Sequence, residues 1–259
     1  MLGLKRLLSV MLFGIALAVI GGLAWAPQAS ADQERCYGTV AKQLADKEWN
    51  YVRTTMTVRN GAISDADARA KRFIADVLWA YTAGVFTTTN DDNQWVEAGY
   101  TRGWDTDVGT NDILTLYWAE RHYLPQDGRY VYVEHRISSP AISGGDTISV
   151  RLTHLRGGVA NSVWGIYIEG DKRAESDDQA ADHAHLIATG IECTASSGKL
   201  GNSTNRVDNK NMLRSQDGGS TSNGWEGDGL LYNVDGVHEV HGNWKSGYTG
   251  EWWWSWRNW

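Results

Sequence analysis

The sequence lacks a long hydrophobic run after its first 31 residues, lacks an excess of basic residues, and contains only three prolines and two cysteines. Without a later apolar stretch long enough to span a bilayer, we expect no membrane-spanning helix beyond residue 31. Because 31 acidic residues outweigh 24 basic ones, nucleic acid and anionic membrane surfaces are poor candidate partners. No Ser-His-Asp elbow, phosphate-binding loop or nucleotide fingerprint supports the corresponding enzyme classes.

Residues 1–31 have the pattern of a secretory signal peptide. Lys5 and Arg6 precede an apolar stretch, and Ala29-Ser30-Ala31 offers a small-residue cleavage site. Loss of this segment removes basic but no acidic residues, so the exported chain is more acidic than the net charge of −7. We therefore expect a secreted, extracellular protein with no stable membrane insertion after cleavage.

The two cysteines, Cys36 and Cys193, both lie in the part expected to be exported. Export favours a disulfide between them, and two separate buried thiols are the alternative. The bridge would close a long loop, for which the chain-entropy model gives a stabilisation of roughly 4–5 kcal/mol.

Segments of alternating apolar and polar residues recur along the chain, separated by clusters of Gly, Asp and Asn. This spacing, with 29 glycines, predicts an all-β double-sheet sandwich. The expected strands are residues 51–61, about 72–81, 93–101, 113–120, 129–137, 146–155, 163–169 and 185–194. The segment from 72 to 81 also keeps helical spacing, but its alternation favours a strand.

Other segments flank these strands. We expect a short amphipathic helix over 36–50 within an N-terminal segment 32–50, and a helical turn near 64–71 that begins with a capping box. The sandwich domain is expected over 51–195, followed by a polar loop or linker over 196–224. Residues 225–259 are expected to form Trp-rich strands, including a hairpin about Asp235-Gly236.

Five short segments resemble a known group of proteins in their order and spacing. They are WVEAGY (95–100), YWAE (117–120), GGDTISVRL (144–152), VWGIYIEG (163–170) and TGIECT (189–194). The set resembles secreted actinobacterial proteins of unassigned activity and, more remotely, glutamic peptidases of the eqolisin type. The resemblance implies a concanavalin-like, jelly-roll sandwich over about residues 51–195.

In those peptidases a glutamine and a glutamate on the concave face carry out catalysis. The resemblance places Glu97 at or beside the glutamine position, so this chain departs from the family's pair. Glu192 is the carboxylate nearest the glutamate position, and His185 or Leu186 are the alternatives for that position.

Alternation within the strands predicts which face Glu97 occupies. Val96, Ala98 and Tyr100 form the better core face, so Glu97 and Trp95 are expected on the opposite face. The strand 129–137 splits in the same way. We expect a groove that contains Trp95, Glu97, Tyr132, Glu134 and Arg136.

Two functions fit such a groove. Aromatic rings with a few carboxylates favour carbohydrate binding, through Trp95, Tyr132 and Arg136. Paired carboxylates favour acid hydrolysis of a protein or glycan, with Glu97 and either Glu192 or Glu134 as catalytic groups. A purely structural ion pair between Glu97 and a nearby arginine is the alternative to both.

The C-terminal segment EWWWSWRNW (251–259) is expected to form a strand whose Trp252, Trp254 and Trp256 share one face. This strip is either a platform for sugar rings or a buried edge of the sandwich. From the functions considered above, extracellular polysaccharide or a protein substrate is the expected partner.

No metal site and no cofactor are predicted from the sequence. Asp105 and Asp107 lie in a segment that has part of a calcium-loop pattern but lacks the full ligand set. The pairs His183/His185 and His238/His241 lack zinc spacing with a clear third ligand.

Overall fold

Strands make up most of the chain, as the alternating segments predict. The computed structural model describes residues 36–43, 49–70, 72–83, 93–105, 110–155, 162–193, 198–200, 207–224, 229–233, 238–245 and 249–256. Only the backbone is described for residues 36–43, 104–105, 110–112, 198–199 and 229–256. All of these residues belong to the unit Glu34–Trp259. Their strands form two antiparallel sheets, so the predicted all-β double-sheet sandwich is confirmed.

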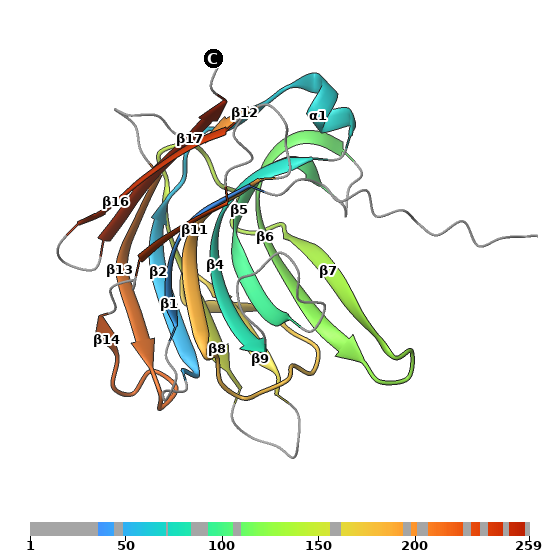
Figure 1. Ribbon diagram of the computed structural model, residues 1–259, viewed down its shortest axis with the longest axis vertical. Helices are drawn as coiled ribbons and strands as arrows, with labels where there is room; N and C mark the ends of the chain where they lie inside the picture. Colours follow the sequence, from blue (N-terminus) through green and yellow to red (C-terminus); the bar gives the residue numbers. More distant parts are fainter. Residues whose placement is uncertain are drawn as a thin grey trace, which may run out of the picture. The chain divides into compact units, whose positions relative to one another are not determined.

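One sheet has seven strands within the described residues, and Figure 1 shows its central members side by side. In spatial order they are β15 (Gly229–Asn233), β1 (Cys36–Gln43), β11 (Leu186–Cys193), β4 (Phe73–Ala83), β5 (Gln94–Asp105), β6 (Thr110–Leu124) and β7 (Arg129–Ile137).

The second sheet has ten strands within the described residues. Eight follow one another in space: β10 (Asp171–Glu175), β9 (Trp164–Ile168), β8 (Thr147–His154), β2 (Tyr51–Thr57), β13 (Val207–Ser215), β17 (Thr249–Trp256), β12 (Gly198–Leu200) and β3 (Ala62–Ile63). The other two, β14 (Asn223–Gly224) and β16 (His238–Lys245), pair with β13 and β17.

A short helix, α1 (Asp65–Arg69), confirms the expected helical turn. Ser64 caps it, because the Ser64 hydroxyl accepts a hydrogen bond from the Asp67 backbone N–H at 3.2 Å. Along the described part of the chain, no helix reaches the length and hydrophobicity that crossing a bilayer requires.

Three expected elements are corrected. The N-terminal helix is wrong over residues 36–43, which form strand β1 between β11 and β15. Part of the expected polar linker is strand β13, which pairs with β2 and β17. The hairpin about Asp235-Gly236 is also wrong, since β15 joins the seven-stranded sheet and β16 joins the other. In each case pairing with distant strands overrides the local sequence pattern.

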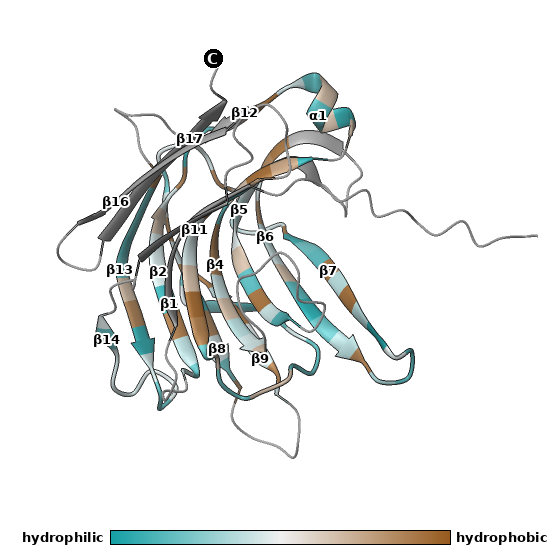
Figure 2. Cartoon of the chain, viewed as in Figure 1, coloured by the Kyte–Doolittle hydropathy of each residue, from teal (hydrophilic) through white to brown (hydrophobic). Residues whose placement is uncertain are grey.

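The main core lies between the sheets. Side chains from both sheets are fully buried there, including Val52, Leu78, Val96, Leu116 and Ile166. A second, smaller cluster lies on the other face of the seven-stranded sheet and includes Val77, Trp79, Tyr117 and Leu186. Figure 2 shows hydrophobic colour on β4 and β11, while β7 at the sheet edge is more hydrophilic.

A polar cluster interrupts the core between the sheets. Asp76 is fully buried, and its Oδ1 accepts a hydrogen bond from the Asn209 side-chain amide at 2.8 Å. The Asn209 oxygen lies 2.9 Å from the Thr189 hydroxyl and 3.3 Å from the Thr54 hydroxyl. Burial raises the pKa of the Asp76 carboxyl well above its usual range, although the Asn209 amide offsets part of that rise.

Candidate functional site

Glu97 lies on the face of the seven-stranded sheet opposite the inter-sheet core. Its neighbours Val96, Ala98 and Tyr100 are fully buried in that core, as alternation along β5 predicts. Glu97 itself faces the second, smaller cluster, which contains Trp79 and Tyr117. We call this side of β11, β4, β5, β6 and β7 the carboxylate face. It carries Trp79, Trp95, Glu97, Tyr117, Tyr132, Glu134 and Glu192.

Two small residues, Ala119 and Gly99, lie near Glu97 in the strand ladder. In the ladder, Glu97 is opposite Trp79 on one side and Ala119 on the other, and Ala119 is in turn opposite Glu134. Gly99, two residues along β5, permits a close approach of β4. A Cβ atom at Gly99 would lie 1.9 Å from the Asp76 carbonyl oxygen. Any larger residue at that position would therefore push the two strands apart.

Two tryptophans hold the Glu97 carboxylate. Its Oε2 accepts hydrogen bonds from the Trp79 indole N–H at 2.5 Å and the Trp95 indole N–H at 2.9 Å. Glu97 is only 2% exposed, so without such donors its burial would cost several kcal/mol. The indoles offset that cost and fix the orientation of the carboxylate, because both bonds are made to a charged acceptor.

The other carboxylate oxygen faces Tyr132. The Tyr132 hydroxyl lies 3.4 Å from Glu97 Oε1 and 3.1 Å from Glu134 Oε2. A tyrosine hydroxyl has a single proton, so it donates to one of the two carboxylates at a time. Tyr132 is also 37% exposed, which makes it one of the most exposed large apolar side chains in the described part of the protein.

Aromatic rings from three strands surround this pair of carboxylates. The ring centroids of Tyr81 and Trp95 lie 5.6 Å apart, and those of Trp95 and Tyr132 lie 6.3 Å apart. The Arg121 guanidinium lies 5.6 Å from the centroid of the Trp95 ring and 5.0 Å from that of Tyr130. These separations are typical of favourable aromatic and cation–π contacts.

Tyr117 adds a buried hydroxyl to the carboxylate face. The side chain is 2% exposed, and its hydroxyl forms no hydrogen bond with any described residue. Burial raises the pKa of this phenol well above its usual range, and the nearby Glu97 and Glu192 carboxylates raise it further. The phenol therefore stays protonated over the physiological range and offers a hydrogen-bond donor.

The structure brings together four of the predicted site residues by direct contact: Trp95, Glu97, Tyr132 and Glu134. Arg136 follows on β7, directly opposite Tyr117 in the ladder. Glu192 is 2% exposed and continues the series of Leu186 and Ala188 along β11, which places it on the same face. Strand β4 separates it from β5, and both Glu192 and Glu97 lie close enough to Tyr117 to raise the pKa of its phenol.

Other predicted sites fall partly outside the described residues. Trp252, Trp254 and Trp256 lie in strand β17, as expected, but only the backbone is described there. Of the weak calcium pattern, Asp107 lies outside the described residues, and only the backbone is described for Asp105.

A cavity of about 210 Å³ lies on the other sheet, away from the expected groove. It is lined by Tyr51, Arg53, Ser149, Arg151, Glu169 and Gly170. None of these residues belongs to the predicted site.

The two cysteines occupy opposed positions. Cys36 on β1 is directly opposite Cys193 on β11. Opposed residues of antiparallel strands have Cα atoms about 4.5–5.5 Å apart, which is within the span of a disulfide. The expected bridge therefore stays a prediction with a compatible register.

Sequence reasoning missed Trp79, Tyr81 and Tyr117 as members of the site. Alternation placed Trp79 and Tyr81 on one face of their strand, but it carries no information on which strand lies beside it. Trp79 meets Glu97 because β4 pairs with β5 in a particular register, and that register is set by the fold.

The fold has known counterparts. A scytalido-glutamic peptidase solved with a transition state analog inhibitor superimposes with a TM-score of 0.50 at 12% identity, over 86% of this chain and 98% of that chain. The eqolisin peptidase SCP-B, in complex with a tripeptide, gives 0.47 at 14% identity over the same shares. Galectin LEC-6 of Caenorhabditis elegans gives 0.31 at 9% identity, over 62% of this chain and 93% of that chain.

These likenesses concern the fold. No protein-family model matches the chain, and no curated protein matches it in sequence. The expected remote similarity to glutamic peptidases is therefore confirmed as a shared sandwich fold, while function has to be argued from the side chains.

Proposed function

We propose that the protein is secreted and binds carbohydrate on its carboxylate face. The observation that carries this proposal is the exposed Tyr132 ring, which lies beside Trp95 while its hydroxyl reaches both Glu97 and Glu134. Sugar rings have apolar C–H faces that suit aromatic planes, and their hydroxyls suit carboxylate acceptors. The partner would be an extracellular polysaccharide.

The supporting groups have complementary roles. Trp95 and Tyr132 supply ring surface, Glu134 supplies an acceptor for sugar hydroxyls, and the buried Glu97 orients the Trp95 and Tyr132 side chains. Arg121 lies among the rings, and the Tyr117 hydroxyl supplies a donor. Because the two indoles already hold Glu97, little side-chain entropy remains to be lost when a ligand binds, which favours affinity.

A pull-down on insoluble polysaccharides tests the proposal. Wild-type protein is incubated with cellulose, chitin and bacterial cell-wall material, and the bound fraction is measured with and without Tyr132→Ala. We expect at least one matrix to retain the wild type and Tyr132→Ala to reduce retention about tenfold, since loss of a stacked aromatic costs roughly 1–1.5 kcal/mol or more. Tyr167→Ala, on the other sheet, is the matched control and should bind as the wild type does.

Two results would overturn the proposal. Either no matrix retains the folded wild-type protein, or Tyr132→Ala and Tyr167→Ala behave alike. The triple variant Trp252→Ala, Trp254→Ala, Trp256→Ala tests separately whether the C-terminal strip contributes. If that variant alone loses binding, the ligand platform lies on β17 and the carboxylate face is not the site.

A second function is favoured by the shared hydroxyl of Tyr132. Because it lies 3.4 Å from one carboxylate oxygen and 3.1 Å from the other, the two oxygens are no farther apart than the sum of these distances. That limit, about 6.5 Å, is compatible with the carboxyl separations of glycosidases. We propose acid hydrolysis of a glycan or protein by Glu97 with Glu134 or Glu192 as the alternative activity.

Product analysis separates the two functions. Glycan and protein substrates are incubated with the protein at acid and neutral pH, and soluble products are measured. Hydrolysis predicts product release that Glu134→Gln reduces at least about 100-fold, as expected for loss of a general acid or base. Binding predicts retention on the matrix without product.

A further inference from the structure

A second cluster of titratable groups lies apart from the carboxylate face. Strand β6 carries Glu120 and His122, two residues apart and therefore on one side of the strand. Ala119, between Trp118 and Glu120, packs on the carboxylate face, so Glu120 and His122 belong to the opposite side of the sheet. Asp177, just after β10, completes the cluster.

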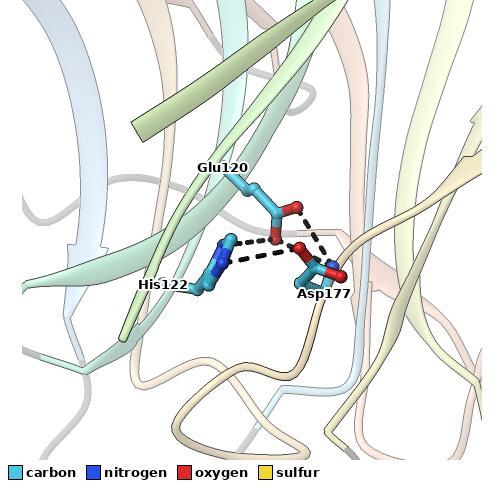
Figure 3. A group of neighbouring side chains, drawn as sticks. All are labelled: Glu120, His122 and Asp177. Atoms are coloured by element: carbon cyan, nitrogen blue, oxygen red, sulfur yellow. Dashed lines mark hydrogen bonds and ion pairs between the residues drawn. The ribbon is translucent and has the colours of Figure 1, made fainter. Parts of the chain in front are cut away.

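The three side chains converge. Figure 3 shows both carboxylates turned toward the imidazole ring of His122. His122 Nδ1 lies 3.4 Å from Glu120 Oε2, and His122 Nε2 lies 3.4 Å from Asp177 Oδ2. One ligand atom from each residue can be chosen so that all three lie within 4.8 Å of one another.

These separations suit a metal ion. Zinc binds imidazole nitrogen and carboxylate oxygen at about 2.0–2.2 Å, so neighbouring ligands around a tetrahedral ion are roughly 3.3–3.5 Å apart. The contact between His122 Nδ1 and Glu120 Oε2 has that spacing, whereas Asp177 faces the other ring nitrogen, Nε2. Because one ligand atom from each residue lies within 4.8 Å of the others, a rotation of the exposed Asp177 side chain toward Nδ1 would complete the ligand set.

A buried nitrogen without a hydrogen bond points to the same conclusion. His122 is 3% exposed, and its Nδ1 forms no hydrogen bond with any described residue, although Glu120 Oε2 is near. A buried polar atom without a partner usually costs about 1–3 kcal/mol, so it calls for a ligand or another explanation. A metal ion would satisfy an imidazole nitrogen and also balance the charge of the two carboxylates.

Outer contacts hold the glutamate in place. Both Glu120 oxygens lie 3.0 Å from the Asp177 backbone N–H, and the Gln179 side-chain amide donates to Oε2 at 2.8 Å. Gln179 is in turn fixed by the Thr82 hydroxyl, which donates to its oxygen at 3.2 Å. Such outer hydrogen bonds orient the ligands of metal sites.

We propose that Glu120, His122 and Asp177 form a binding site for a divalent transition-metal ion, with Zn²⁺ as the best fit to one imidazole and two carboxylates. The mixed nitrogen and oxygen donors disfavour Ca²⁺ and Mg²⁺, which prefer oxygen ligands. The Asp177 side chain is 72% exposed, whereas the side chains of Glu120 and His122 are buried. The ion would therefore be reached from the Asp177 side, where a fourth position is open to water.

Calorimetric titration with ZnCl₂ tests this site. Protein without a histidine tag is first treated with EDTA and dialysed into a buffer that does not bind metal. We expect one Zn²⁺ ion per chain. Asp177→Asn should weaken binding at least about tenfold, because even outer-shell losses cost 10–100-fold in metal affinity. Since the Asp177 side chain is exposed, this variant should keep its fold, which near-UV circular dichroism verifies.

Asp182→Asn is the matched control. Asp182 is similarly exposed, at 69%, and also lies beside a histidine, with 2.9 Å between its Oδ1 and His183 Nδ1. It should bind Zn²⁺ as tightly as the wild type does. A second readout is the melting temperature, which saturating Zn²⁺ should raise for the wild type and for Asp182→Asn but much less for Asp177→Asn.

Three outcomes would overturn the proposal. The first is a titration of the wild type with no heat beyond dilution. The second is equal affinity for the wild type and Asp177→Asn, and the third is a loss of affinity in Asp182→Asn that matches or exceeds the loss in Asp177→Asn. His122→Asn serves as a further variant, and it should abolish both binding and the zinc-dependent rise in melting temperature.

Discussion

Asp76 and Glu97 are buried carboxyl groups on adjacent strands of one sheet, and they face opposite sides. Asp76 lies in the core between the sheets, where its Oδ1 accepts one amide hydrogen bond while its Oδ2 forms none with the described residues. Glu97 accepts two indole hydrogen bonds at one oxygen and faces a tyrosine hydroxyl with the other.

The surroundings of Asp76 and Glu97 suit the two carboxyl groups to different roles. Asp76 accepts a hydrogen bond from Asn209 of the other sheet, and Asn209 in turn accepts one from Thr189 of the Asp76 sheet, so this chain of contacts specifies how the sheets are placed against each other. Its raised pKa reflects burial without enough donors. Glu97 is surrounded by donors and borders the exposed Tyr132, which suits a group that orients the side chains a ligand would touch.

The largest expected effect is on the free energy of unfolding, and it comes from the predicted disulfide between Cys36 and Cys193. Strand β1 pairs with β11 along its whole length, and Cys193 on β11 faces the core while the adjacent Glu192 is on the carboxylate face. Replacing Cys36 and Cys193 by alanine should lower the free energy of unfolding by about 4 kcal/mol, because the open chain gains loop entropy. Urea denaturation measures the change.

Peptide mapping without reducing agent comes first in that experiment. It should recover one peptide pair linked through Cys36 and Cys193. Recovery of both cysteines as free thiols would show that no disulfide joins β1 to β11.

Removing the acceptor on the carboxylate face should have the next largest effect. Glu97→Leu leaves the Trp79 and Trp95 indole N–H groups without their acceptor, so we expect a loss of about 2–4 kcal/mol, at roughly 1–2 kcal/mol for each donor left without a partner. Glu97→Gln keeps an acceptor oxygen and should cost less than half as much by urea denaturation. Equal costs for the two variants would mean that the indole bonds are unimportant for stability.

On the core face, Asp76→Asn should raise the free energy of unfolding, whereas Glu97→Leu lowers it. The pKa of Asp76 is raised in the folded protein, so at low pH the group is protonated in both states and contributes nothing to stability. As pH rises from the unfolded value of about 4 through the folded value, the wild type loses stability, because only the unfolded state ionises readily. Asparagine cannot ionise, so the variant does not lose stability in this way as pH rises.

The stability difference between Asp76→Asn and the wild type should therefore grow from pH 4 to pH 8, as measured by urea denaturation. Asp171→Asn, at an exposed position, is the control and should show little change with pH. A difference that shrinks with rising pH would contradict the raised pKa.

Much of this arrangement follows from the sequence. Alternation of Val96, Glu97 and Ala98 is sufficient to place Glu97 opposite the core, and the same kind of alternation identifies the segments before and after it in the chain as strands. The capping residue Ser64 likewise fixes the start of α1 from local signals alone. These features depend on residues close together in the chain.

The remainder depends on pairing between distant segments. Asp76 meets Asn209 across 133 residues, and Glu120 meets Asp177 across 57. Residues 36–43 have a helical pattern but complete a sheet between β11 and β15. No local periodicity contains this information, which explains why the polar core, the cluster at His122 and strand β1 were not predicted.

The smallest expected effect distinguishes two tyrosines on the carboxylate face. Tyr117 has a buried hydroxyl without a hydrogen-bond partner in the described part of the chain, so Tyr117→Phe should change the free energy of unfolding by less than about 0.5 kcal/mol or raise it slightly, because a desolvated hydroxyl is removed. Tyr132→Phe removes a hydroxyl that reaches both Glu97 and Glu134 and should cost about 1 kcal/mol.

If Tyr117 donates to a bound ligand, its phenylalanine variant should weaken retention on polysaccharide while stability is unchanged. A stability loss in Tyr117→Phe as large as that in Tyr132→Phe would instead show that the buried hydroxyl has a structural partner, and it would remove Tyr117 from the proposed site.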